Sequence, residues 1–221
     1  ASVALTDDNN LYIDDGLDGF PSFGFRPGSE VKQPYRLYLP EKLPAEFTLV
    51  ATFKPTSFRT SYLFAVLNPF ETVVQLGIRI SEPVKNNRNI NVSLVYTNSD
   101  LHSHSEEVAK FTVPKLTKKW SKIVIRVSTT DVTLYLNCHE MAKQRVTRIP
   151  LELMFDTAST LYIAQAGPHI QEKYDIQLCF FNYPAYHVSL RNSSFERYFL
   201  KIATLLKETC SKKHVASPFS L

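Results

Sequence analysis

The chain has 221 residues, of which 44% are hydrophobic and 21% are charged, and its formal net charge is +4. These values exclude an intrinsically disordered chain, because there are enough apolar residues to build a buried core. No window approaches the roughly 18 uninterrupted apolar residues of a membrane-spanning helix, and the few glycines form no phosphate-binding motif.

From Phe47 onwards the sequence is a succession of short β-type segments separated by polar or proline-containing breaks. In chain order, we expect strands at residues 47–53, 62–67, 73–80, 89–96, 108–113, 120–128, 132–138, 161–165 and 176–181. In segment 73–80 the apolar residues alternate, so we expect Gln75, Gly77 and Arg79 to face solvent. The break at residues 129–131 predicts a hairpin. This pattern is typical of an antiparallel β-sandwich.

After residue 181 the hydrophobic period changes from that of a strand to that of a helix. Ser193 and Glu196 form a capping-box pattern. An apolar helical stripe follows, made of Phe195, Phe199, Ile202 and Leu206. We therefore expect one amphipathic helix, ending near Lys207, across one end of the sandwich. The sequence has no internal repeat or linker, so residues 1–221 are predicted to be one domain with a frayed tail at 211–221.

The sequence offers little that would support catalysis or metal binding. It has no Gly-x-Ser-x-Gly motif, and the adjacent carboxylates of Glu106 and Glu107 would point to opposite faces of a strand. His102 and His104 could supply two zinc ligands, but a third is lacking, so an exposed loop is the simpler interpretation. The acidic residues between Asp14 and Asp18 lack the spacing of an EF-hand loop and fit a turn instead. We therefore expect no enzymatic activity, no metal and no cofactor.

Three cysteines and two glycosylation sequons bear on the cellular compartment. Cys138, Cys179 and Cys210 lack zinc-site spacing, which leaves either one disulfide with one free thiol or three free thiols. The sequons begin at Asn91 and Asn192. Together these features favour a secreted glycoprotein.

Basic residues recur between residues 115 and 148. The candidates for binding a sulfated glycosaminoglycan are Lys115, Lys118, Lys119, Lys122, Arg126, Lys143 and Arg145, and Arg148 lies close to them in the sequence. A strip of flexible cations can bind such a polyanion through many salt-sensitive contacts. Lysine-rich turns also solubilise sandwiches and protect edge strands from aggregation. Both interpretations stay open at this point.

Several segments resemble one known family. They are Leu43–Val50, Tyr62–Val66, Val74–Ile78, Lys119–Ile123, Val132–Cys138 and Leu161–Gly167. In order and spacing these segments resemble the thrombospondin N-terminal-like domains, a laminin G-related family, and are most similar to those of the multiplexin collagens of types XV and XVIII. The resemblance covers about residues 18–177 and implies a curved, jelly-roll-like, laminin G/concanavalin-like β-sandwich.

The resemblance also implies a location and partners. It implies a disulfide between Cys138 and Cys210, with Cys179 as a buried thiol, in a secreted domain of the extracellular matrix or basement membrane. Relatives bind heparin or heparan sulfate and matrix or cell-surface proteins, and no catalytic residue comes with the family. We therefore expect a non-enzymatic, heparin-binding adhesion domain of a trimeric collagen, with no nucleic-acid partner and no membrane insertion. The alternatives are a protein-interaction or assembly module without glycosaminoglycan specificity and a calcium-dependent lectin.

Overall fold

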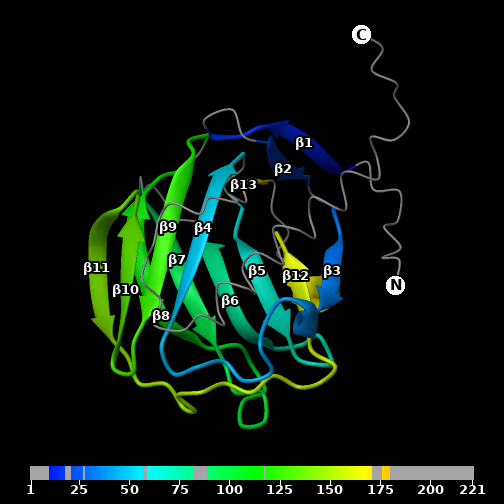
Figure 1. Cartoon of the computed structure of the whole chain (residues 1–221), viewed down its shortest axis with the longest axis vertical. Coiled ribbons are helices and arrows are strands. Elements are labelled where there is room, and N and C mark those ends of the chain that lie inside the picture. Colours follow the sequence, from blue (N-terminus) through cyan, green and yellow to red (C-terminus); the bar gives the residue numbers. More distant parts are fainter. Residues whose placement is uncertain are drawn as a thin grey trace.

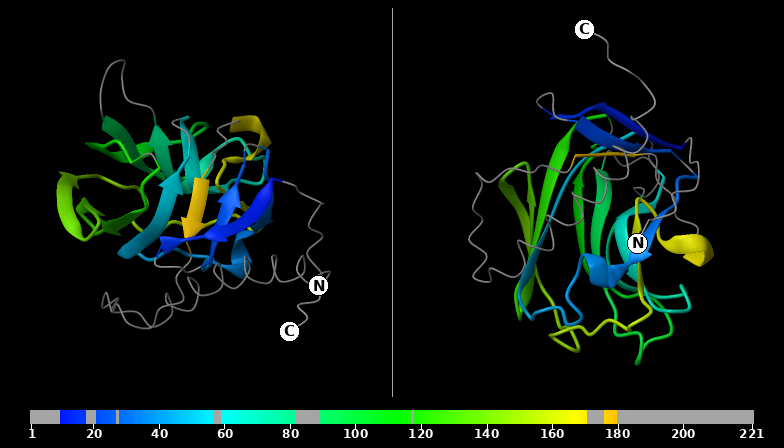
Figure 2. Two further views of the ribbon diagram at one scale, coloured as in Figure 1. Left: turned by 90° about the horizontal axis from the view of Figure 1, so that it is seen from above. Right: turned by 45° about the vertical axis from the view of Figure 1, so that its right-hand side comes forward.

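A computed structural model describes residues 10–17, 21–26, 28–56, 59–81, 89–116, 118–170 and 176–179 of the chain. Two antiparallel β-sheets pack face to face, as Figure 1 and the rotated views of Figure 2 show. This arrangement confirms the predicted all-β, jelly-roll-like sandwich. The predicted helix from Ser193 to Lys207 and the tail at 211–221 lie outside the described residues.

The first sheet, called sheet A here, has seven strands in the order β1-β2-β13-β4-β9-β10-β11. Their bounds are β1 Leu11–Asp15, β2 Pro21–Phe25, β13 Ile176–Cys179, β4 Phe47–Pro55, β9 Ser121–Val127, β10 Asp131–Leu136 and β11 His139–Arg145. Strands β9 and β10 form the predicted hairpin.

The second sheet, sheet B, has six strands in the order β3-β12-β5-β6-β7-β8. Their bounds are β3 Val31–Pro34, β12 Thr160–Ile163, β5 Ser61–Leu67, β6 Val74–Ser81, β7 Asn89–Tyr96 and β8 Glu107–Pro114. Two short helical turns complete the described structure, η2 at Tyr35–Leu37 and α1 at Gly167–Ile170. No helix among the described residues is long and apolar enough to span a membrane.

The main core lies between the two sheets and follows the alternation of the sequence. In β9, Ile123, Ile125 and Val127 are buried, so Lys122 and Arg126 lie on the outer face of sheet A. Sheet B contributes residues such as Leu94 from its central strands. Removing these side chains from water is the main force that holds the sheets together, at about 1.5–3 kcal/mol for each large apolar side chain.

A second, smaller apolar cluster lies on sheet B and includes Tyr62, Leu67, Val95 and Tyr162, with Ile170 of α1 packed against it. The expectation that the alternate face of β6 is solvated is therefore wrong for Gln75 and Gly77, which are buried, whereas Arg79 is partly exposed. The Gln75 amide is held by hydrogen bonds with Ser99 and Ser159. Such bonds remove the cost of burying a polar side chain.

Four strands have no counterpart among the predicted segments: β1, β2, β3 and β11. The first three contain proline, glycine or acidic residues and gain their structure by pairing, β2 with β13 and β3 with β12. Strand β11 follows a two-residue turn in which Asn137 and Cys138 have φ of 48° and 70°. Positive φ at both central residues matches the type I′ hairpin geometry, which turns the chain back along β10.

Candidate functional site

The predicted glycosaminoglycan-binding residues lie on the outer face of sheet A and on the loop that leads into it. Lys115, Lys118 and Lys119 belong to the connection between β8 and β9, at the upper end of the sandwich in Figure 1. Lys122 and Arg126 follow on β9, and Lys143 and Arg145 on β11. All seven are exposed except Lys122, which is half-buried.

Strand register brings part of this set into one row. Arg126 pairs with Thr133 of β10, and Thr133 pairs with Lys143 of β11, so the three side chains share one face. Strand spacing places Arg126 and Lys143 about 10 Å apart, and Lys122 lies about 13 Å from Arg126 along β9. These distances exceed the Debye length of about 8 Å in physiological salt, so mutual repulsion between the cations is largely screened.

Two carboxylates lie among these cations, those of Asp131 and of the exposed Glu140, which pairs with Tyr135 on the same outer face. The Asp131 Oδ2 atom is 3.3 Å from the Lys143 Nζ atom. Desolvation alone would raise the pKa of Asp131, but hydrogen bonds from Thr130, Lys143 and Ser128 outweigh it and lower the pKa below its usual value. Asp131 therefore stays ionised near neutral pH and neutralises part of the charge of Lys143. By contrast, residues 108–130 contain no acidic residue at all.

Lys54 is a further cation of this surface that the sequence did not single out. Its Nζ atom lies 5.2 Å from the centre of the Trp120 ring, a cation–π contact. Its neighbour Pro55 accepts a hydrogen bond from the backbone N–H of Lys118 at 2.8 Å. The alternation of β4 could have identified it: Phe53 is buried in the core, so the next residue, Lys54, points to the outer face of the sheet. We call the following residues the basic face: Lys54, Lys115, Lys118, Lys119, Lys122, Arg126, Lys143 and Arg145.

Arg148 does not belong to the basic face, although its place in the sequence suggested that it might join it. It is only 3% exposed. Its guanidinium donates hydrogen bonds to the carbonyl oxygens of Ala45, Ser128 and Leu151, at 2.6, 2.9 and 3.1 Å. It also lies 4.9 Å from the centre of the Tyr96 ring. Its role is to join three loops inside the fold.

The cysteines and sequons are only partly described. Cys138 is exposed in the β10–β11 turn, beyond the end of the strand that was expected to contain it, and has no disulfide partner among the described residues. Cys210 lies outside them, so the disulfide stays a prediction. Cys179 ends β13, where it pairs with Thr52 in the register. Asn91 is partly exposed on β7 and accepts a hydrogen bond from Thr112, whereas Asn192 lies outside the described residues.

The histidines and acidic residues weighed as metal ligands have other neighbours. The His102 Nδ1 atom lies 3.1 Å from a Glu106 oxygen, and the His102 and His104 ring centres are 6.4 Å apart. Asp14 and Asp15 belong to strand β1 and not to a turn. Within the described ranges, no group of three or more His, Cys, Asp or Glu side chains could hold a metal ion.

Comparison with known sequences places the chain beside a collagen. No family model matches the sequence. The chain is similar to part of the collagen alpha-1(XVIII) chain of Homo sapiens, with 26% identity over 172 residues. The matched part is 78% of this chain and only 9% of that collagen. This similarity confirms the resemblance to the multiplexin collagens.

Solved structures show a similar fold. Domains LG4-5 of the mouse laminin alpha1 chain superpose with a TM-score of 0.47 and 10% identity, over 69% of this chain and 38% of that one. A SAP-like pentraxin from Limulus polyphemus gives a TM-score of 0.47 and 17% identity, over 62% of this chain and 64% of that one. These likenesses concern the fold alone.

Proposed function

Because this chain is a relative of the multiplexin collagens with a laminin G-like sandwich fold, we propose that it is a non-enzymatic extracellular-matrix domain that binds heparin or heparan sulfate through the basic face. The binding attaches its parent protein to sulfated glycans of the matrix or of cell surfaces. The observation that carries the proposal is the gathering of cations from β4, the β8–β9 loop, β9 and β11 on one surface.

Charge density on this surface is the physical basis of the proposal. Between Val108 and Thr130 the chain has six basic residues and no acidic one. Lysine and arginine on flexible stems can follow a linear polyanion without a deep pocket, and each contact is charge-assisted. The cations are spaced widely enough for each to contact a separate anionic group. A long sulfated chain therefore gains several contacts at once, which increases its affinity.

A matched pair of triple variants tests the proposal. The first variant is Lys118→Ala, Lys122→Ala and Arg126→Ala. The second removes the same charge from the opposite edge of the molecule, through Lys32→Ala, Arg36→Ala and Lys42→Ala on β3, η2 and the loop after it. We expect the first variant to lose at least tenfold in affinity for immobilised heparin, about 1.4 kcal/mol, and the second to lose far less. Equal losses would mean that net charge alone governs the interaction.

A second candidate function is recognition of a matrix protein or receptor, and one observation favours it. Six of the eight large apolar side chains that are exposed among the described residues belong to η2 and to the β5–β6, β7–β8 and β11–β12 connections. The β7–β8 and β11–β12 connections run along the lower end of the sandwich in Figure 1. The six residues are Leu37, Phe70, Leu101, Ile149, Leu151 and Met154. Exposed apolar residues gathered in one region are a common feature of protein-binding surfaces. The alanine variants of the basic face would leave such an interaction intact.

A further inference from the structure

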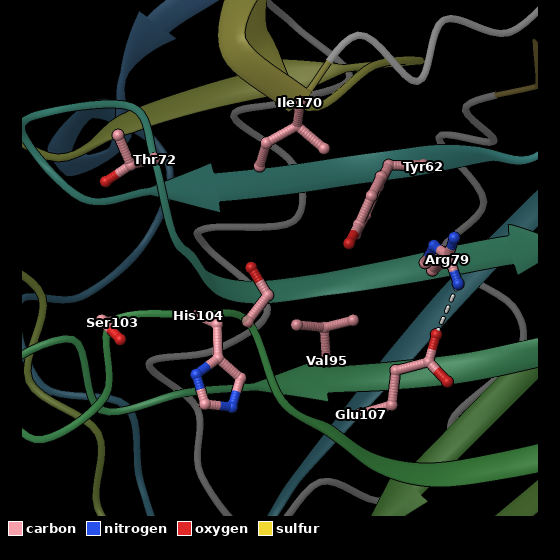
Figure 3. Close-up of a pocket in the computed structure, with 9 residues that line it drawn as sticks. Tyr62, Thr72, Arg79, Val95, Ser103, His104, Glu107 and Ile170 are labelled. Atoms are coloured by element: carbon pink, nitrogen blue, oxygen red, sulfur yellow. Dashed lines mark hydrogen bonds and ion pairs between the residues drawn. The ribbon is translucent and has the colours of Figure 1, made fainter.

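Sheet B, which does not contribute to the basic face through its strands, has a pocket on its outer side. This pocket of about 380 Å³ lies between β5, β6, β7 and β8, the loop before β8 and the helical turn α1. Figure 3 shows that side chains from these separate segments converge around Val95. The volume lies within the range of about 300–1,000 Å³ typical of small-ligand sites.

Part of the pocket lining is apolar. Tyr62 of β5, Val95 of β7 and Ile170 of α1 form this part. Tyr62 and Val95 are buried members of the smaller apolar cluster on sheet B, and the partly buried Ile170 packs against it. Gly77 lies between them on β6, where a Cβ atom would come within 2.9 Å of the Phe64 carbonyl oxygen and 3.1 Å of the Tyr62 ring. The lack of a side chain at Gly77 therefore allows Tyr62 to lie in its present position.

The rest of the lining is polar and carries both signs of charge. The Arg79 Nη1 atom lies 2.7 Å from the Glu107 Oε1 atom, and both side chains remain partly exposed. His104 and Ser103 stand at the rim and are exposed. The charges of Arg79 and Glu107, the two ion-paired residues of the lining, cancel. The Lys110 Nζ atom lies 3.8 Å from the Glu107 Oε2 atom, outside the lining. The lining therefore offers hydrogen-bond donors and acceptors whose paired charges balance.

Beside Arg79 in the strand register, Ser93 has a hydroxyl that is unpaired within the described part of the chain and lies beneath this face, outside the residues that line the pocket. Ser93 of β7 pairs with Arg79 of β6. It is fully buried, and its hydroxyl has no hydrogen-bond partner among the described residues. Buried polar groups almost always have a partner, which can be an ordered water.

We propose that this pocket binds a neutral saccharide ring, independently of the basic face. A sugar presents vicinal hydroxyl groups that both donate and accept, which suits the Arg79–Glu107 pair and the His104 imidazole. Its C–H face can lie against Ile170, the partly exposed one of the three apolar lining residues. A sulfated ring would bring charge to a pocket whose own charges already cancel, and it gains more on the basic face. The molecule therefore has two glycan-binding surfaces of different chemistry, one on each sheet.

Saturation-transfer NMR on the whole chain tests the proposal. The probes are the methyl glycosides of glucose, galactose and N-acetylglucosamine, each at about 10 mM, which populates a site of millimolar Kd. We expect transfer to at least one of these sugars. Ser103→Trp fills the exposed rim with an indole ring, and His104→Ala removes one polar contact. Each should reduce the saturation transfer, the first by at least tenfold.

The triple variant of the basic face, Lys118→Ala with Lys122→Ala and Arg126→Ala, is the matched control. It should weaken heparin binding and leave the transfer to neutral sugars unchanged, whereas Ser103→Trp should do the reverse. Thermal unfolding confirms that each variant is folded. The proposal is overturned if none of the sugars shows transfer to the wild-type protein, or if the transfer persists in a folded Ser103→Trp variant. It is also overturned if the basic-face variant abolishes the transfer.

Discussion

At the scale of single residues, Arg148 shows how a cation can serve the fold instead of the surface. Its guanidinium presents several donors in one plane, so it can bond the carbonyl oxygens of Ala45, Ser128 and Leu151 together. Tyr96 supports the same region by donating to the Pro150 carbonyl at 2.8 Å. Burial raises the pKa of Tyr96, although the nearby Arg148 works against this increase.

Replacing Arg148 should therefore destabilise the protein. Arg148→Met removes three partly buried hydrogen bonds from a charged donor and leaves the Ala45 and Ser128 carbonyls without it, whereas the Leu151 carbonyl still accepts from Tyr96. We expect the free energy of unfolding to fall by about 3 kcal/mol. Arg148→Lys keeps the charge but cannot reach three acceptors, so a smaller loss is expected. Urea denaturation measures both. An unchanged midpoint for Arg148→Met together with weaker heparin binding would show that Arg148 is a surface ligand after all.

Replacing Asp131 should strengthen heparin binding, whereas the alanine variants of the basic face should weaken it. Asp131→Asn removes the carboxylate that neutralises Lys143, so the variant should elute from heparin at higher salt than the wild type. Asp100→Asn makes the same change of charge on the loop between β7 and β8 and should shift elution less. Heparin chromatography of the two variants at equal pH decides between a local and a net-charge effect.

The ionisation of the Asp131 carboxylate also determines the pH range in which this residue contributes to stability. Because folding lowers the pKa of Asp131, its contribution to stability is present above the ordinary carboxyl pKa of about 3.9 and is lost as the pH falls through the lowered value. The contribution of this residue should thus be constant between pH 5 and pH 8. Asp131→Asn should have the same effect on heparin elution throughout that range, and a change across it would contradict the assignment.

At the scale of elements, Gln144 connects the edges of the two sheets. Its side-chain amide accepts from the Lys110 N–H at 2.9 Å and donates to the Lys110 carbonyl at 2.7 Å. Lys110 belongs to β8, the edge strand of sheet B, and Gln144 to β11, the edge strand of sheet A. The amide thus satisfies two backbone groups that would otherwise be open to another strand.

Removing this amide should loosen the edge locally. For Gln144→Ala we expect faster hydrogen exchange at the Lys110 amide and a loss of about 1 kcal/mol in the free energy of unfolding. Met141→Ala, on the same strand, is the control because Met141 is exposed and should change neither quantity much. Unaltered exchange at Lys110 in Gln144→Ala would show that the amide does not protect this edge.

Strands β9 and β11 show which elements could be predicted from the sequence and why others could not. Strand β9 was predictable because its buried and outer residues alternate, and burial fixes its register. Strand β11 was not, because His-Glu-Met-Ala-Lys-Gln-Arg has no alternation and is rich in residues that favour helices. Its structure depends on the turn at Asn137 and Cys138 and on pairing with β10. Local sequence carries little of that information.

The candidate site likewise has features that could be predicted from the sequence and features that could not. The cations of β9 and of the loop before it could be predicted from their clustering alone. The pairing of Lys143 with Asp131, the contact of Lys54 with Trp120 and the burial of Arg148 all depend on strand register and loop packing. The pocket on sheet B was not predictable, since its residues come from segments more than a hundred positions apart, from Tyr62 to Ile170.

At the scale of the whole molecule, surfaces of different chemistry occupy separate parts of one sandwich. The basic face lies on the outside of sheet A and on the β8–β9 loop, the pocket lies on sheet B, and six exposed apolar side chains belong to η2 and to the β5–β6, β7–β8 and β11–β12 connections. Figure 1 shows the β8–β9 loop at the upper end of the sandwich and the β7–β8 and β11–β12 connections at the lower end. A two-sheet sandwich allows this separation because its faces and ends do not share side chains. Changes on one surface should therefore leave the others intact, as distant sites behave additively.

The most direct test of the central claim is elution of the wild-type protein from a heparin column beside a sulfonate cation exchanger of matched charge density. Both columns attract cations, but only heparin presents sulfates on a glycan chain. We predict elution from heparin at clearly higher salt, because the basic face is an arranged site and not a diffuse charge. Elution at the same salt from both columns would contradict the claim and identify the basic face as a solubilising surface.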